Sequence, residues 1–292
     1  MLLDYRVPLA DWVETAVRWI QVQYAAGFDG FSDLVRVVID GLLAGLVAVP
    51  PLALVAVLAA LVAWQAGWRL GVFALLGLFL VHNIGLWTPF LETLALVVTA
   101  QVLIVIVGVP LGILAAGSDV AERVMRPVLD FMQTMPAFVY LIPAIMFFGI
   151  GLVPGVVATF IFSLPPLVRL VNLGIRQVPT DLVEAADAFG TTRLQKLVKV
   201  QVPLALPTMM AGLNQSIMLN LSMVVIASMI GAGGLGAEVL RGIQRIKVGQ
   251  GFEAGLAVVI LAIVLDRLTA SFAARRRPGA RGGGAGRPEE AA

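Results

Sequence analysis

The sequence predicts an all-α, polytopic membrane protein: a helix bundle with about seven transmembrane helices. Hydrophobic residues make up 60% of the 292 residues, whereas charged residues make up only 13%. Long stretches such as 131–168 and 200–237 contain no Asp, Glu, Lys or Arg. Several apolar runs reach the roughly 20 residues that a helix needs to span a bilayer. So apolar a chain lacks the polar side chains needed to cover a water-soluble surface.

Residues 1–40 are expected to form an N-terminal segment of short amphipathic helices. In residues 9–20 apolar side chains, including Trp12, recur at helical spacing, and polar side chains occupy the other side. Residues 31–40 repeat this pattern. Two placements remain open for these helices: in the membrane interface with Trp12 at headgroup depth, or packed against the transmembrane domain.

The transmembrane permease domain is predicted to occupy residues 41–273. Its seven expected spans are 41–63, 70–87, 93–116, 128–149, 153–174, 205–230 and 253–273. Prolines interrupt several of these spans, which predicts kinks, because proline removes a backbone hydrogen bond that neighbouring helices must replace.

The distribution of Lys and Arg sets the expected orientation, since positively charged loops stay in the cytoplasm. The tail after the last span carries five arginines, so we expect a cytoplasmic C-terminus and, with seven spans, an N-terminus outside. Loops 117–127 and 175–204 agree with this orientation, whereas the basic loop 237–251 does not. The tail, residues 274–292, is predicted to be disordered, because it holds no apolar residue larger than alanine.

Several functions are excluded by what the chain lacks. It contains no cysteine and only one histidine, His82, so we expect no metal site. A formal charge of +2 is too small to indicate a nucleic-acid partner. The phosphate-binding loop G-x-x-x-x-G-K-[ST] is absent. We therefore expect no catalytic residues, no cofactor bound by this chain and no ATP hydrolysis by it.

One cytoplasmic loop, residues 175–204, holds a compact charged segment between two apolar spans, and we call it the elbow. Asp181 is expected to cap a first helix, with Glu184 in the capping-box position. Gly190 is expected to end that helix, because glycine favours the position after a C-cap.

The second half of the elbow predicts another short helix. Thr191 or Thr192 would cap it, and Pro203 would close it and begin the next span. Such a helix–glycine–helix unit suits docking into a groove of a cytoplasmic protein. The competing interpretation is an amphipathic loop that rests on the membrane surface.

The spacing of the elbow resembles the coupling motif of bacterial ABC importer permeases, E-A-A, three residues, G, nine residues, I-x-L-P. Here E-A-A occupies 184–186, glycine is Gly190, and V-Q-V-P occupies 200–203, with valines for the usual isoleucine and leucine. The segments "TLALVVTAQVLIVIVGVPLGILAA", "MQTMPAFVYLIPAIMFFGIG" and "LSMVVIASMIGAGGLG" are similar to the permease subunit of glycine betaine/proline importers. This resemblance covers roughly residues 88–270.

The resemblance implies a type I ABC importer permease fold in the bacterial inner membrane. It also implies a homodimer, driven by a separate ATPase subunit that uses the ATP and fed by an extracytoplasmic substrate-binding protein. Glu184, Ala185, Ala186 and Gly190 would form the helix that docks on the ATPase, and Pro203 would complete the motif. The implied cargo is a zwitterionic or quaternary-amine osmolyte such as glycine betaine or proline, with choline, carnitine and methionine left open.

Three polar side chains within the spans are candidates for lining the translocation pathway. Gln215 and Ser222 are seven residues apart and therefore share a helix face. Gln133 lies in the predicted fourth span. The competing interpretation is that such side chains form hydrogen bonds between helices.

Two other classes of membrane protein compete with the importer permease. A self-sufficient secondary transporter predicts ligands for a coupling ion inside the spans. An intramembrane enzyme predicts a nucleophile and a base in register. The predicted spans are nearly bare of ionisable groups, and His82 has no nearby carboxylate in the sequence. The charged elbow favours the permease.

Overall fold

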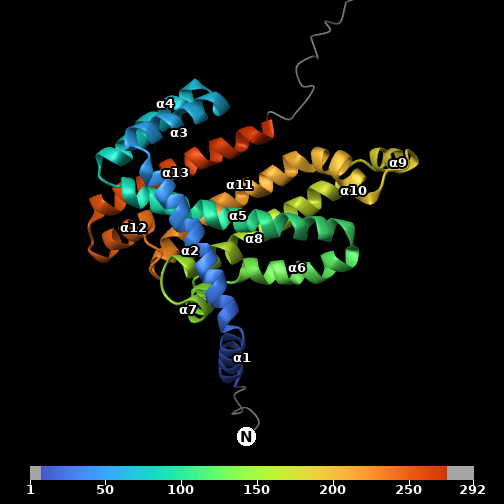
Figure 1. The fold of residues 1–292 in the computed structure, drawn as a ribbon, viewed down its shortest axis with the longest axis horizontal. Coiled ribbons are helices and arrows are strands. Elements are labelled where there is room, and N and C mark those ends of the chain that lie inside the picture. Colours follow the sequence, from blue (N-terminus) through green and yellow to red (C-terminus); the bar gives the residue numbers. More distant parts are fainter. Residues whose placement is uncertain (1–7, 275–292) are drawn as a thin grey trace, which may run out of the picture.

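The computed structural model describes residues 8–274, which are built from helices and contain no β-strand (Figure 1). The helices are α1 (Leu9–Gln23), α2 (Ala25–Ala48), α3 (Pro51–Ala66), α4 (Trp68–Asn83), α5 (Trp87–Gly117), α6 (Asp119–Thr134), η1 (Ala137–Tyr140), α7 (Leu141–Phe148), α8 (Leu152–Arg176), α9 (Thr180–Ala188), α10 (Arg193–Lys196), η2 (Leu197–Gln201), α11 (Val202–Ser228), α12 (Gly234–Gln244) and α13 (Val248–Ala274). The all-α prediction is confirmed. The tail predicted to be disordered lies outside the described residues, apart from Ala274.

Three long apolar helices, α5, α8 and α11, form the centre of the bundle (Figure 1). Glycines bring their backbones together: a Cβ added at Gly112 of α5 would lie 2.5 Å from Cβ of Val171 in α8. A Cβ added at Gly212 of α11 would lie 2.9 Å from Cβ of Leu170 in α8. Small residues permit such close packing of membrane helices.

Four predicted spans are confirmed as helices, because 93–116, 153–174, 205–230 and 253–273 correspond to α5, α8, α11 and α13. Within the described chain, the helical stretches that contain these four spans are each long and apolar enough to cross a membrane. Counting two sharply bent helix pairs as one span each gives up to six. The expected span 70–87 corresponds to α4, an apolar helix of only 16 residues, so the count of seven is approximate.

The other two predicted spans are wrong as continuous helices, and a proline marks the break in each. In place of 41–63, the structure has α2 and α3, which meet at Pro50 with a bend of 102°. In place of 128–149, α6 ends and the chain turns by 105° near Pro136. The residue before each proline has extended backbone, as expected, since the proline ring disfavours a helical conformation there.

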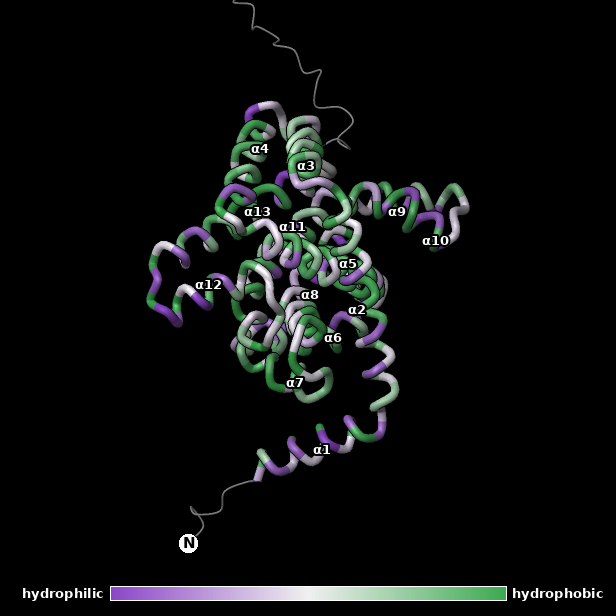
Figure 2. The backbone as a smooth tube through the Cα atoms, turned by 60° about the vertical axis from the view of Figure 1, so that its left-hand side comes forward, coloured by the Kyte–Doolittle hydropathy of each residue, from purple (hydrophilic) through white to green (hydrophobic). Residues whose placement is uncertain are grey.

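The first helix, α1, projects from the bundle as an arm, whereas α2 crosses the bundle and buries Val35 and Ile39 in its core (Figures 1 and 2). The helix expected at 9–20 is α1, which has no buried residue and is tied to α7 where Gln21 Nε2 donates to the carbonyl oxygen of Met146 at 2.7 Å. The separate helix expected at 31–40 is wrong, because these residues belong to α2, which continues unbroken through residue 48. Loops 117–127 and 237–251 are also largely helical, as parts of α6 and α12.

Candidate coupling elbow and polar faces

The elbow (residues 175–204) projects from one end of the bundle, beyond the ends of α5 and α6 (Figure 1). Its first helix, α9, begins at Thr180 with Pro179 as the N-cap residue. The predicted cap at Asp181 is therefore wrong. Asp181 instead lies in the first turn of α9, where a carboxylate complements the partial positive charge of the helix N-terminus.

Gly190 follows the end of α9 as predicted and reverses the chain. Its φ is +74°, a left-handed conformation that glycine adopts without a steric penalty. The N–H of Gly190 donates to the carbonyl of Asp187 at 2.9 Å, and the N–H of Thr191 donates to the carbonyl of Ala186 at 3.2 Å. These two bonds form a Schellman motif and hold the turn between the two arms of the elbow.

The second arm begins at Thr192, which caps α10. Its Oγ1 accepts from the N–H of Gln195 at 3.3 Å, and the Gln195 side chain accepts from the N–H of Thr192 at 3.0 Å. Lys196 Nζ then pairs with Asp187 Oδ2 of α9 at 2.7 Å. A reciprocal cap and an ion pair between the arms make the elbow a defined unit rather than a loose loop.

Pro203 begins the next span as predicted, since it lies at the start of α11, but it does not close the elbow, because a helical path continues from Arg193 to Ser228. Pro203 lies in the first turn of α11, directly after the π-helical turn Leu197–Gln201. Proline has no N–H to donate to the carbonyl four residues earlier, and such an interruption is accommodated by a local change of helix type. The second arm is therefore the end of a transmembrane helix.

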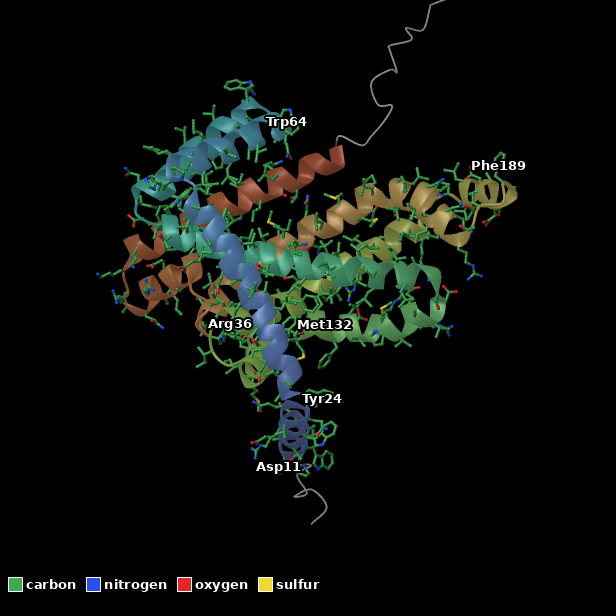
Figure 3. All side chains as sticks on the ribbon, in the orientation of Figure 1. Asp11, Tyr24, Arg36, Trp64, Met132 and Phe189 are labelled. Carbon is green, nitrogen blue, oxygen red and sulfur yellow. The ribbon has the colours of Figure 1, made fainter. Side chains whose placement is uncertain are left out.

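The outer surface of the elbow is partly apolar. Phe189, at the tip in Figure 3, is 89% exposed, and Leu194 is 69% exposed. Glu184 and Ala185 are exposed, whereas Ala186 is buried. Exposed aromatic and aliphatic side chains on a protruding, polar unit are typical of a protein–protein interface.

Arg176 anchors the base of the elbow to two neighbouring helices. It pairs with Asp119 at 2.8 Å and with Glu122 at 3.2 Å, both on α6, and its Nη2 donates to the carbonyl of Ala115 on α5 at 2.9 Å. Because Arg176 is the last residue of α8, these contacts join the base of the elbow to α5 and α6.

The predicted pathway residues lie on two different surfaces. Gln215 and Ser222 are exposed on the same face of α11, where Ser222 Oγ donates to the carbonyl of Met218 at 3.0 Å. Gln133 lies on α6, and its Oε1 accepts a hydrogen bond from Arg169 Nη1 of α8 at 2.7 Å.

Sequence reasoning missed two polar arrangements. Gln101 Nε2 of α5 donates to Ser216 Oγ at 2.8 Å, and Asn220 Nδ2 donates to Gln101 Oε1 at 2.8 Å, which joins α5 to the buried face of α11. Ser216 and Asn220 are four residues apart and therefore share a helix face, and this spacing could have indicated a polar contact with a neighbouring helix. Arg169 was the other omission, although it is the one charged residue in the predicted span 153–174.

No metal-binding group is found in the part of the chain that the structure describes: no three His, Asp or Glu side chains lie together there. His82 packs instead against Trp87, with ring centroids 5.7 Å apart and nearly perpendicular planes.

Comparison with known proteins places this arrangement in a family. Residues 108–278 match the family described as binding-protein-dependent transport system inner membrane component. The chain is 49% identical to the glycine betaine transport system permease protein OpuAB of Bacillus subtilis over 93% of this chain and 96% of that protein. It is 52% identical to the glycine betaine/carnitine transport permease protein GbuB of Listeria monocytogenes, over 91% and 95% of the two chains.

A solved structure supports the same conclusion. A chain of the MetNI methionine ABC transporter, in an inward-facing conformation, aligns with a TM-score of 0.55 and 25% identity, over 65% of this chain and 93% of that chain. The aligned structure and the relatives are all components of transport systems. This chain is likewise a multi-pass membrane protein with a transport role. The chain belongs to the family of inner membrane components of binding-protein-dependent transport systems.

Proposed function

We propose that this chain is the permease subunit of an ATP-driven importer for glycine betaine or a closely related zwitterionic osmolyte. The observation that carries the proposal is the similarity to OpuAB, a glycine betaine permease, at 49% identity over 93% of the chain. Carnitine is the second candidate substrate, because GbuB is a glycine betaine/carnitine permease. Proline belongs to the same proposed class of substrate, and choline and methionine are the alternative substrates in the test below.

The proposed complex contains two copies of this chain, a cytoplasmic ATPase and an extracytoplasmic binding protein. The ATPase docks on the elbow, where Glu184, Ala185, Ala186 and Gly190 form the coupling helix. This placement makes the elbow cytoplasmic and, two spans further along the chain, the C-terminus as well; the proposed external N-terminus requires seven spans in total. The apolar tip at Phe189 supports it, because an exposed aromatic side chain is a common anchor in a partner's pocket.

Coupling in this proposal follows from how the elbow is attached. The second arm of the elbow continues into α11, and the first arm follows Arg176 at the end of α8. When ATP-driven closure brings two ATPase copies together, each elbow moves, and α8 and α11 move with it. The bundle then exposes its pathway to one side of the membrane at a time, by a shift between two conformations. Gln215 and Ser222 line this pathway from the exposed face of α11.

The test is uptake of labelled glycine betaine into proteoliposomes that contain the permease, its ATPase and its binding protein. Uptake that requires all three proteins and ATP is the expected result, with competition by unlabelled carnitine to rank the second candidate. ATP-dependent uptake of methionine or choline but not of glycine betaine would refute the substrate assignment. Uptake without the ATPase would refute the importer mechanism.

A further inference from the structure

A groove that contains several charged side chains lies between α6 and α8, at the base of the elbow. Its volume is about 370 Å³, within the range of small-molecule sites. The charged and polar side chains that line it are Glu122, Arg126, Asp130, Arg169, Asn172 and Arg176. The groove therefore presents both signs of charge in one small volume.

At the inner end of this groove Arg169 forms a three-residue cluster with α6. Its Nη2 pairs with Asp130 Oδ1 at 2.5 Å, and its Nη1 donates to Gln133 Oε1 at 2.7 Å. These bonds use two of the five N–H donors of a guanidinium group. The side chains of Arg169 and Asp130 remain 41% and 56% exposed, so both are accessible to a further ligand.

Arg169 is set back from the charged end of α8. It lies seven residues before that end, about 10 Å along the helix axis, and no other charge occurs in α8 before Arg176. Charged groups within membranes line water-filled cavities or pair with protein, so an accessible ion pair on this apolar helix favours a water-filled groove over contact with acyl chains.

The helix α6 separates this groove from an apolar surface. Its outward side is formed by four exposed apolar side chains at helical spacing, namely Val120, Val124, Val128 and Phe131. Its other side carries the carboxylates that pair with Arg169 and Arg176. This division predicts a dry, lipid-type environment outside α6 and a wet one between α6 and α8.

From these observations we infer that Arg169 and Asp130 form a binding site for a zwitterion within the translocation pathway. The inference rests on the proposed function, since the substrate there carries one quaternary ammonium and one carboxylate. The carboxylate takes the unused N–H groups of Arg169, which recognise carboxylates in a fork geometry, and the ammonium group lies against Asp130. Gln133 keeps the guanidinium oriented when Asp130 changes partner. Such a site favours a zwitterion over a molecule with a single charge.

The absence of cysteine allows a direct test with single-cysteine variants. Asn172→Cys, one turn from Arg169 in the groove, should react with a cationic, membrane-impermeant thiol reagent, and glycine betaine at high concentration should slow the reaction. Val124→Cys, on the apolar side of α6, is the matched control and should not react. Adding Arg169→Gln to Asn172→Cys should abolish the protection by glycine betaine without abolishing labelling.

Transport gives an independent measurement. Arg169→Gln should lower the rate of glycine betaine uptake by about tenfold or more, which corresponds to the loss of one charge-assisted hydrogen bond. The control Glu14→Gln breaks the exposed ion pair with Arg18 on α1, outside the groove lining, and should leave uptake unchanged. If the wild type imports glycine betaine but the substrate gives no protection, or if protection survives Arg169→Gln, this inference is wrong and the proposed function stands. If the wild type imports no glycine betaine, the proposed function itself fails.

Discussion

The carboxylate Oε2 of Glu92 accepts a hydrogen bond from the backbone N–H of Gly234 at 2.8 Å, although 142 residues separate them. Beside it, Thr93 Oγ1 accepts from the N–H of Leu235 at 2.8 Å. The first N–H groups of a helix have no partner within the helix, so these two side chains of α5 cap α12. They fasten α12 to the end of α5 opposite the elbow (Figure 1).

Replacing Glu92 by alanine should lower the free energy of unfolding by about 1–2 kcal/mol, because a helix cap is lost. The measurement is unfolding of the purified permease in mixed micelles with increasing SDS. Glu253→Ala is the matched control, since Glu253 is an exposed carboxylate at the start of α13. It should change stability by less than about 0.5 kcal/mol. Equal effects of the two substitutions would contradict the capping role of Glu92.

Replacing Gly236 by alanine should separate α12 from α11. The added Cβ would lie 2.3 Å from the carbonyl oxygen of Val224, and backbone atoms cannot rotate away as a side chain does. We expect a loss of about 1–3 kcal/mol in the same unfolding assay. Gly255→Ala in α13 meets no atom within 4 Å and should be neutral or stabilising by up to about 1 kcal/mol. A neutral Gly236→Ala would show that α12 is not held closely against α11.

Replacing Gly190 by valine should uncouple transport from ATP hydrolysis. A β-branched residue is strained at a φ of +74°, so the turn between α9 and α10 should open while the transmembrane helices stay intact. We expect normal amounts of protein in the membrane, continued ATPase activity and strongly reduced uptake. Glu184→Arg should give the same pattern through reversed charge on the docking surface. Uptake at the wild-type rate in either variant would refute the coupling role of the elbow.

Replacing Phe189 by alanine tests docking without changing the backbone. Because the side chain is 89% exposed, its loss should not alter the stability of the permease alone. Binding of the ATPase should weaken by about tenfold or more, as expected for removal of an aromatic anchor. The control Phe252→Ala, at the start of α13, removes another exposed phenylalanine side chain from the opposite end and should leave ATPase binding unchanged. The dissociation constants of the ATPase from the two variants can be measured by titrating labelled ATPase onto the permease in nanodiscs.

The buried contact between Gln101 and Asn220 should show coupling in a double-mutant cycle. Gln101→Leu leaves the amide of Asn220 and the hydroxyl of Ser216 without their partner on α5. Each single substitution by leucine should cost about 0.6–2 kcal/mol, and the double substitution less than the sum. Strict additivity of the two losses in SDS unfolding would show that the hydrogen bond contributes nothing.

Local signals allowed a large part of the molecule to be predicted from the sequence. The apolar runs that form α5, α8, α11 and α13 could be predicted, because the transfer of apolar side chains from water to lipid favours membrane-spanning helices. The turn at Gly190 depends on the conformational freedom of one residue, and its Schellman motif follows from neighbouring backbone groups. The membrane class, the four long spans and the elbow were therefore determined by the sequence alone.

Tertiary structure decided which prolines break the chain and which distant residues meet. Pro50 and Pro136 stand at sharp bends, whereas Pro110 lies inside α5, between Gly108 and Gly112, which pack closely against α8. Arg169 and Asp130 are 39 residues apart, and their pairing depends on the rotation of α6 against α8. Local preferences carry no information about such rotations, since many helix arrangements bury the same apolar faces. The elbow could therefore be foreseen, but the charged groove beneath it could not.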